Sequence, residues 1–209
     1  MLNLNLRYVD DHDIFKDMAN KKTIPACVEH IMPMQSQAFS FIHRNNNIFI
    51  RSGRQTGKTT LLLFMLLNKL QNNTNTTLIY VTRTKTCAID MKNNIMNELK
   101  RIKVEYYIDN NIVIVGNNKF LAININRNLD SIRGYSHISD FYVDDIDLMG
   151  KPYLHSLVNN WIPCISSFNP NIIMTSCTNV DLMKDTTIYN YISTNLSYFN
   201  FNGESYAKK

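Results

Sequence analysis

Short apolar runs alternate with longer amphipathic stretches along most of the chain. The apolar runs predict buried strands, at 48–51, 78–81, 141–143 and 172–174. Apolar residues at helical spacing predict helices, at 31–43, 58–70, 85–101 and 153–161. Because strands and helices alternate, we expect an α/β fold with right-handed crossovers, a mainly parallel central sheet and helices on both faces.

Two segments depart from this alternation. Residues 112–115 and 119–124 flank a Gly-Asn-Asn turn and predict an antiparallel hairpin, and a last strand is expected near 196–201. The helix predicted at 85–101 should turn four apolar side chains inward: Ile89, Ile95, Met96 and Leu99. With 209 residues and 44% hydrophobic content, the chain is long enough for one well-buried domain. We expect that domain at 31–209, preceded by an N-terminal extension at 1–30.

The stretch at 48–63 carries the strongest chemical signal. It reads IFIRSGRQTGKTTLLL, which is an apolar strand, a polar turn with glycines and a helix. Backbone N–H groups in such a turn and the positive end of the helix together bind phosphate. Lys58 can reach the β- and γ-phosphates, and Thr59 can offer its hydroxyl to Mg²⁺. The predicted nucleotide-binding residues of this loop are Ser52, Gly53, Arg54, Gln55, Thr56, Gly57, Lys58, Thr59 and Thr60.

The loop differs from the usual pattern at its first glycine, where Ser52 stands and Gly53 follows one place later. An ordinary strand-to-helix turn is therefore the alternative interpretation. The acidic residue that follows the strand at 141–143, Asp144, supports the phosphate loop, because a carboxylate at that edge can make the second magnesium contact. A solvated strand end is its alternative.

Two more polar groups fit the same site. Gln35 has an amide that can donate to and accept from an adenine edge, although a surface position on its helix is the simpler reading. The hydroxyls after the strand at 172–174 could sense a γ-phosphate or cap the next turn.

Five short motifs occur in a fixed order: Pro33-x-Gln35, then 53–59, 132–134 (Ile-Arg-Gly), 142–145 (Tyr-Val-Asp-Asp) and 175–178 (Thr-Ser-Cys-Thr). Together they resemble the ATPase domain of the large terminase subunit, the DNA-packaging motor of tailed phages and related viruses. The resemblance spans roughly 31–180. It implies a P-loop NTPase of the additional-strand type, which uses ATP and Mg²⁺ and moves double-stranded DNA into a capsid as a homo-oligomeric ring on a portal protein.

The resemblance also implies residue roles. Gln35 would lie at the adenine, Lys58 would hold phosphates, and Arg54 would act in cis on the γ-phosphate. Asp145 would occupy the place of the general base. The magnesium contacts would be Thr59 and, through water, Asp144. The coupling motif would comprise Thr175, Ser176, Cys177 and Thr178. A trans-acting arginine is not identified by the pattern, and the candidates are Arg83, Arg101 and Arg127.

The chain departs from this family at three points. Asp145 stands where the family usually has Glu, and Asn179 stands where Pro often follows the coupling motif. Family members continue into an RNase H-like nuclease domain, for which we expect no room here. A separate nuclease domain or chain and a small terminase subunit are therefore candidate partners, and the host cytoplasm is the expected location.

Two rival functions remain open beside the terminase resemblance. A superfamily 2 helicase-like ATPase shares the Gln motif, phosphate loop and acidic strand, and a nucleotide-binding regulatory subunit would bind without turnover. The net charge of +5 suits a polyanionic partner or a mildly basic surface. No apolar run is long enough to cross a bilayer, and four widely separated cysteines are read as reduced packing residues: Cys27, Cys87, Cys164 and Cys177.

Overall fold

The computed structural model describes residues 38, 41–42, 45–53, 56–127, 130–177, 186–200 and 205–206. Its strands are β1 (Ile48–Ser52), β2 (Thr77–Thr82), β3 (Tyr107–Asp109), β4 (Ile112–Val115), β5 (Asn118–Asn124), β6 (Ile138–Val143), β7 (Asn171–Cys177), β8 (Ser197–Asn200) and β9 (Ser205–Tyr206). Its helices are α3 (Lys58–Asn72), α4 (Lys85–Arg101), α5 (Asp130–Arg133), α6 (Lys151–Ser156), α7 (Ile162–Ile165) and α8 (Thr186–Asn195). Shorter turns are η2 (Ile146–Leu148), η3 (Leu157–Trp161) and η4 (Ser166–Phe168).

The described strands form one sheet in the order β3-β4-β5-β2-β6-β7-β1-β8-β9. From β5 to β8 all neighbours are parallel, and antiparallel pairs lie only at the two ends of the described sheet. The predicted hairpin is the pair β4–β5. Strand β7 lies between β1, which leads into the phosphate loop, and β6, which leads into Asp144. This inserted strand confirms the predicted additional-strand type of P-loop NTPase fold.

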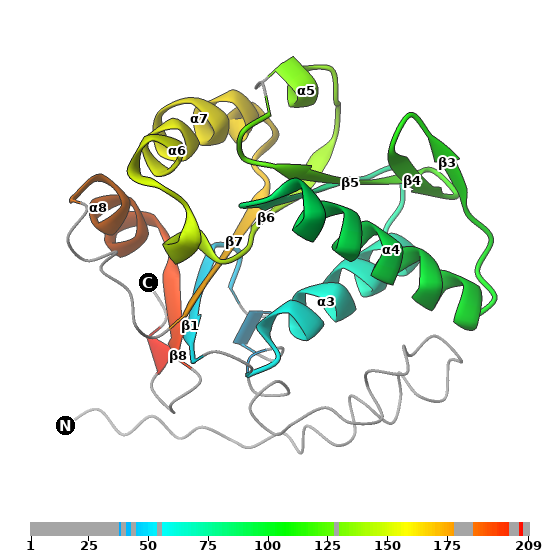
Figure 1. The fold of residues 1–209 in the computed structure, drawn as a ribbon, viewed down its shortest axis with the longest axis horizontal. Coiled ribbons are helices and arrows are strands. Elements are labelled where there is room, and N and C mark those ends of the chain that lie inside the picture. Colours follow the sequence, from blue (N-terminus) through cyan, green and yellow to red (C-terminus); the bar gives the residue numbers. More distant parts are fainter. Residues whose placement is uncertain are drawn as a thin grey trace.

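Helices α3 and α4 cover one face of the sheet, and α6, α7 and α8 cover the other (Figure 1). Alternate residues of each strand point to opposite faces, so the core divides into two clusters. In β2, Leu78 and Tyr80 face α3 and α4, whereas Ile79 and Val81 face α6 and α7. All four are at most 1% exposed, as expected for a central strand covered on both sides.

Helix α4 has the predicted bounds but not the predicted inner face. Thr84 caps it by accepting a hydrogen bond from the Cys87 backbone N–H at 3.1 Å. The buried residues are Ala88, Met91, Ile95 and Leu99. Ile89 is 43% exposed, so its inward placement was wrong. The buried set follows a spacing of three and four residues, which turns position 89 away from the sheet.

The helix predicted at 153–161 is a longer, irregular element. It runs through α6, η3 and α7. The turn η3 is π-helical, because the Ile162 N–H bonds to the Leu157 carbonyl five residues back. Pro163 supplies no N–H and its ring crowds the carbonyl four residues earlier, which accounts for the wide turn.

Two strands are longer than predicted, and several short elements were not predicted. Strand β6 begins at Ile138, inside the segment expected to be a loop, and β7 continues through Cys177, so three residues of the coupling motif belong to the strand. The elements α5, α8, β3 and β9 were not predicted. Residues 38, 41 and 42 are helical, in agreement with the helix expected at 31–43. Among the described helices, none is long and apolar enough to cross a membrane.

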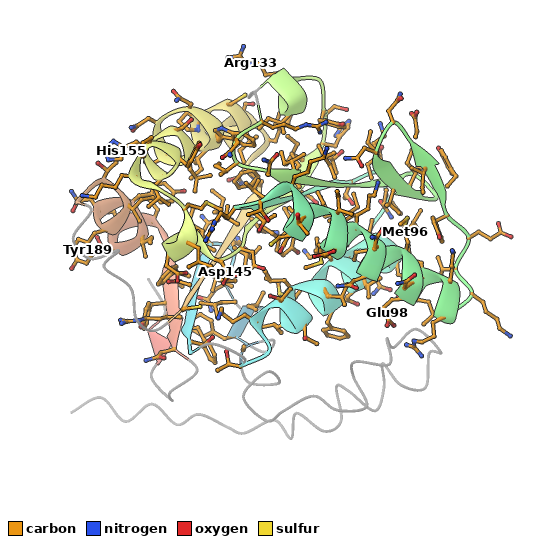
Figure 2. All side chains as sticks on the ribbon, viewed as in Figure 1. Met96, Glu98, Arg133, Asp145, His155 and Tyr189 are labelled. Carbon is orange, nitrogen blue, oxygen red and sulfur yellow. The ribbon has the colours of Figure 1, made fainter. Side chains whose placement is uncertain are left out.

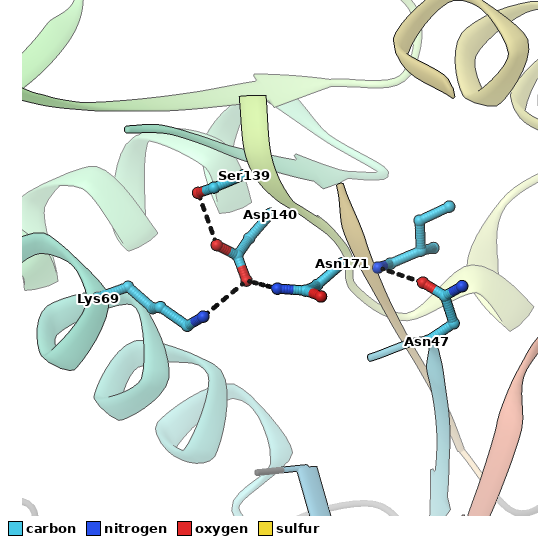
Figure 3. Close-up of polar contacts among 6 residues, drawn as sticks. Asn47, Lys69, Ser139, Asp140 and Asn171 are labelled. Atoms are coloured by element: carbon cyan, nitrogen blue, oxygen red, sulfur yellow. Dashed lines mark hydrogen bonds and ion pairs between the residues drawn. The ribbon is translucent and has the colours of Figure 1, made fainter. Parts of the chain in front are cut away.

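A polar network joins α3 to the amino-terminal edge of the parallel strands (Figure 3). Asp140 of β6 is 1% exposed and accepts from the Asn171 amide at 3.0 Å and the Ser139 hydroxyl at 2.7 Å. Lys69 of α3 completes the arrangement, with its ammonium 3.3 Å from the same carboxylate. Asn47 accepts from the Ile172 N–H at 3.0 Å and aligns β1 with β7. A buried carboxylate with this many donors fixes the register of the strands that lead to the opposite edge.

Asp140→Ala should therefore lower the free energy of unfolding by roughly 2 to 3 kcal/mol, because it removes the buried acceptor of several charge-assisted hydrogen bonds and leaves their half-buried donors without it. Urea unfolding measures the change. Asp90→Ala, which removes an exposed carboxylate from α4, should stay within about 0.5 kcal/mol of the wild type. Equal stability of the two variants would contradict a structural role for this network.

Candidate nucleotide-binding site

The phosphate loop joins β1 to α3 through a backbone position that suits glycine. Gly57 has a φ of 81°, in the left-handed region, and α3 begins at the next residue. Two hydroxyls brace the turn: those of Ser52 and Thr56 are 2.7 Å apart, and Thr56 donates to the Gly53 carbonyl at 2.8 Å. The loop therefore directs the first N–H groups of α3 toward the carboxyl-terminal edge of the sheet, where an anion would meet the positive helix end.

Lys58 is held beneath the loop. Its side chain is nearly buried, and its ammonium donates to the Gly53 carbonyl at 3.1 Å and to the Cys177 sulfur at 3.5 Å. These contacts place the charge between the phosphate loop and the end of β7, which is where a phosphate cradled by the loop would lie.

A cavity of about 470 Å³ opens at this point. It is lined by Thr56, Gly57, Lys58, Thr59, Thr60, Asp145, Leu148 and Cys177. The wall thus combines the loop, the start of α3, the turn after β6 and the end of β7. Its volume and its convergent polar groups are typical of a small-ligand site, and the donors suit a polyphosphate.

Asp144 accepts hydrogen bonds from three hydroxyl groups, one of which is that of Thr59 in the cavity wall. Its carboxylate is 2% exposed, and its Oδ2 accepts from Thr59 at 3.3 Å and from Tyr80 at 2.7 Å. Its Oδ1 accepts from the Thr175 hydroxyl. The hydroxyl of Thr59 and the carboxylate of Asp144 are adjacent hard oxygen ligands beside a phosphate loop. They fit Mg²⁺, which takes one or two protein oxygens together with phosphates and water.

Tyr80 is a site residue that the sequence did not reveal. An aromatic residue in a central strand predicts only core packing, and Tyr80 reaches Asp144 because β2 pairs with β6 in the folded sheet. Burial, followed by the negative charge of Asp144, raises the pKa of its phenol far above the ordinary value. The phenol therefore remains a proton donor to the carboxylate and orients it.

Tyr80→Phe should raise the Mg²⁺ concentration needed for half-maximal turnover by about 10-fold, because loss of a hydrogen bond behind a metal ligand weakens metal affinity by that order. Tyr142→Phe is a matched control. Tyr142 is equally buried on β6, and its hydroxyl has no hydrogen-bond partner in the described part of the chain. A magnesium requirement that moves equally in both variants would indicate a packing effect instead.

Asp145 turns back toward the cavity from a left-handed backbone conformation, with φ 50° and ψ 52°. Its N–H donates to the Thr175 hydroxyl at 3.1 Å, which fixes this turn to β7. Figure 2 labels the side chain near the centre of the molecule. Burial raises the pKa of its carboxyl to about 6, assisted by the charge of Asp144 and opposed by the Lys58 ammonium. Such a carboxylate is ionised at neutral pH and basic enough to orient water.

Asp147 has a different environment. Its Oδ1 accepts from the Cys177 N–H at 3.0 Å, so its carboxylate ties η2 to the end of β7. The Cys177 thiol in turn lies 3.9 Å from Asp145 Oδ1 and donates to it. Burial and the charge of Asp147 raise the pKa of this thiol, which keeps it protonated. These contacts favour Asp145 over Asp147 as the group that faces a ligand.

Seven of the predicted site residues line this one cavity: Thr56, Gly57, Lys58, Thr59, Thr60, Asp145 and Cys177. Ser52 and Ser176 are buried beside it and bond within the protein, Ser176 to the Cys177 carbonyl at 3.1 Å. Four predicted site residues lie outside the described part of the chain and stay predictions: Gln35, Arg54, Gln55 and Thr178. The three described cysteines are free, as expected. Cys87 is exposed and Cys177 lines the cavity, so neither is a simple packing residue.

Comparisons with known proteins agree with this geometry. The ATPase domain of the Thermus phage P74-26 large terminase has a TM-score of 0.57 at 15% identity, over 70% of this chain and 64% of that one. A large terminase from a thermophilic bacteriophage, in complex with ADP, gives 0.54 at 12%, over 82% of this chain and 45% of that one. The UvsW helicase from bacteriophage T4 gives 0.59 at 11%, over 90% and 67%.

The resemblance to large terminase ATPase domains is therefore confirmed at the level of the fold, and the helicase has the same fold. This chain spans less than two thirds of either terminase chain. No curated protein matches the sequence. A family model described as DEAD/DEAH box helicase matches residues 32–185. Since that match covers most of the sequence, from before the phosphate loop to beyond β7, the chain belongs to the DEAD/DEAH box helicase family.

Proposed function

We propose that this chain is the ATP-hydrolysing domain of a motor that moves double-stranded DNA into a viral capsid. The observation that carries the proposal is the cavity lined by Lys58 and Asp145, with Asp144 hydrogen-bonded to Thr59 of its wall, at the carboxyl-terminal edge of a sheet in which β7 separates β1 from β6. The likeness to two terminases, one of them solved with ADP, supports this reading over that of a general nucleotide-binding fold.

In this proposal the phosphate loop and the first turn of α3 bind the triphosphate, and Lys58 leaves the Gly53 carbonyl to contact the transferring phosphoryl group. Thr59 and Asp144 would hold Mg²⁺, which when bound neutralises charge that develops on the phosphates. Asp145 orients the attacking water and accepts its proton. Arg54, outside the described residues, would stabilise the γ-phosphate from the same chain.

Thr175 is placed to couple the site to the rest of the sheet. Its hydroxyl donates to Asp144 and accepts from the Asp145 N–H, so one residue of β7 contacts both acids. A change in the position of either acid would therefore reach β7 directly. This arrangement supports the coupling role proposed for the motif that begins at Thr175.

The proposed assembly is a homo-oligomeric ring on a portal protein, with a small terminase subunit and a nuclease domain or chain as further partners, in the cytoplasm of an infected host cell. The test is the ATPase rate of the purified chain with and without double-stranded DNA. We expect duplex to stimulate turnover. Tight ATP binding without turnover in either condition would instead favour a regulatory subunit.

A superfamily 2 helicase is the second candidate, because the family model is that of a helicase and the T4 UvsW helicase shares the fold. The two functions differ in the nucleic acid that they require. A helicase should be stimulated by single strands and should separate a labelled duplex, whereas a packaging motor should respond to duplex without separating it.

A further inference from the structure

A second cluster of metal-ligating side chains lies beside the proposed magnesium contacts. Asp145, Asp147 and Cys177 each present one ligand atom, and these three atoms all lie within 4.8 Å of one another. Cys177 is 8% exposed and both acids are half-buried, so the cluster is partly withdrawn from bulk water. It combines two carboxylates with a thiol, whereas an ordinary acidic surface offers oxygen ligands alone.

Two segments of the chain bring these ligands together. Asp145 precedes η2, Asp147 lies within it, and Cys177 ends β7. Asp147 Oδ1 accepts from the Cys177 N–H at 3.0 Å, and the Asp145 N–H donates to the Thr175 hydroxyl at 3.1 Å. Hydrogen bonds of this kind orient ligands before a metal arrives. Each carboxylate has two oxygens, so an oxygen that accepts a hydrogen bond leaves the other to bind a metal.

A cation already lies beside the cluster. The Lys58 ammonium donates to the Cys177 sulfur at 3.5 Å, and the same sulfur lies 3.9 Å from Asp145 Oδ1. In the proposed mechanism Lys58 moves to the phosphates of ATP, which leaves the sulfur and the two acids to another cation. The cluster therefore attracts positive charge, and Lys58 is its competitor for a metal ion.

The thiol determines which metal fits. Mg²⁺ prefers oxygen ligands, whereas a thiolate with two carboxylates suits Zn²⁺, which takes four ligands in a tetrahedron. Ligand atoms around zinc lie about 3.5 Å apart, so movements of about 1 Å, supplied by rotation of the carboxylates, complete the contacts. Asp145 and Cys177 both line the nucleotide cavity, which leaves the fourth position to water or a phosphate oxygen. The thiol releases its proton to solvent as the sulfur–zinc bond forms.

The magnesium contacts are chemically distinct from this cluster. Asp144 accepts from the hydroxyls of Thr59, Tyr80 and Thr175, so its surroundings are hard oxygen groups. Such groups suit Mg²⁺ and bind a thiophilic ion poorly. The two positions can therefore select different ions at the same edge of the sheet.

From these observations we infer that Asp145, Asp147 and Cys177 bind a zinc ion at the edge of the nucleotide cavity, and that this ion inhibits ATP hydrolysis. The inhibition rests on the proposed function, in which Asp145 accepts the proton of the attacking water. A carboxylate oxygen that coordinates zinc shares its electron pair with the metal and is a poor base. The ion also ties η2 to the end of β7. Zinc would therefore act as a reversible inhibitor that leaves the phosphate loop intact.

The direct test measures metal binding by the full, reduced chain without nucleotide. The first equivalent of Cd²⁺ reports thiolate coordination through its ultraviolet charge-transfer band, and competition with a chromogenic chelator gives the zinc affinity. Cys177→Ser should remove this band and weaken zinc binding by at least about 100-fold, since even a lost hydrogen bond behind a ligand costs about 10- to 100-fold. The matched control, Cys87→Ser, removes an exposed thiol from α4 and should keep both signals. A wild type without the band, or a band that survives Cys177→Ser, would overturn the site.

Two further variants test the cluster without changing the thiol. Asp147→Asn keeps an oxygen that can accept the Cys177 N–H but removes a charged ligand, so it should weaken zinc binding by about 10-fold. Lys58→Met removes the ammonium that competes for the sulfur, so it should strengthen zinc binding by about 10-fold. Zinc affinity that is unchanged in both variants would place the ion elsewhere and overturn the inference.

ATPase assays separate this inference from the proposed function. Zinc at a buffered micromolar concentration, in the presence of Mg²⁺ and ATP, should inhibit the wild type, and a zinc chelator should restore the rate. Each variant is compared with its own rate without zinc: Cys87→Ser should be inhibited like the wild type, and Cys177→Ser should not. If the wild type binds zinc and keeps its full rate, the inhibition is overturned. If the wild type never hydrolyses ATP, the proposed function fails and the binding experiment alone decides the zinc site.

Discussion

Lys58→Ala should abolish ATP hydrolysis and weaken nucleotide binding. The Lys58 ammonium lies at the base of the phosphate loop, where it would contact the transferring phosphoryl group, and Ala offers no charge to stabilise the transition state. We expect the turnover number to fall by at least about 10³-fold, since loss of a single oriented donor at such a centre already costs that order. A steady-state ATPase assay at saturating ATP measures the rate, and a fluorescent ATP analogue measures the affinity.

The control must separate chemistry from folding, because Lys58 also contacts Cys177 at the end of β7. Lys58→Met keeps an unbranched side chain at the same place without the charge, and its thermal midpoint should stay near that of the wild type. Lys100→Ala removes an exposed ammonium from α4 and should leave the turnover number unchanged. Near-normal turnover in well-folded Lys58→Ala would disprove the assignment of the phosphate loop.

The phosphate loop could be predicted from the sequence because its signals are local. An apolar strand, a turn with Gly57 and a leucine-rich helix are contiguous, so they require no knowledge of distant contacts. The signal for Asp144 is also local, because this residue directly follows the apolar run at 141–143. In both cases the backbone geometry is determined by neighbours within about one helical turn.

Contacts between strands were harder to predict. Tyr80 approaches Asp144 only because β2 pairs with β6, and Thr175 bridges both acids only because β7 is inserted beside β6. Sequence periodicity indicates which side chains are buried but not which strands are neighbours. The hydroxyls after 172–174 were accordingly expected at a strand end, whereas the strand continues through them.

A regular helix was predicted at 153–161, although a proline follows it closely in the sequence. Pro163 interrupts the helical hydrogen-bond ladder, and the structure has a π turn immediately before it. Ile89 illustrates the opposite error, in which a single apolar residue was assigned inward although Ala88 and Met91 define the buried face. Residues that face the sheet are identified by the spacing of the whole set, not by the hydrophobicity of one member.

Asp145→Asn should lower DNA-stimulated ATP turnover by about 10² to 10⁴-fold, the usual contribution of a positioned general base. Asn tests the role of the negative charge at this position. Asp145 has a left-handed backbone, and Asn tolerates this conformation about as well as Asp, so the variant changes the charge and little else. Nucleotide affinity should be retained, because the loop and Lys58 supply the phosphate contacts. The measurement is single-turnover hydrolysis beside equilibrium ATP binding.

Asp145→Glu addresses whether the shorter side chain limits the basal rate. Asp145 is one methylene shorter than the Glu usual in large terminases, and a shortfall of roughly 1 Å at a reacting centre can cost about 10²-fold in rate. We therefore expect the wild-type chain to hydrolyse ATP slowly without DNA, and Asp145→Glu to raise that basal rate. Glu should also cost roughly 1 kcal/mol of stability, since it tolerates a left-handed backbone less well than Asp.

Asp147→Asn completes the comparison. Asp147 already accepts the Cys177 N–H, and an Asn side-chain oxygen can accept the same hydrogen bond, so this variant should keep most of its DNA-stimulated activity. All three variants should be measured beside the wild type, with and without duplex DNA. Full activity in Asp145→Asn together with inactivity of Asp147→Asn would show that Asp147 is the base. An unchanged basal rate in Asp145→Glu would show that assembly or DNA, rather than side-chain length, limits hydrolysis in the isolated chain.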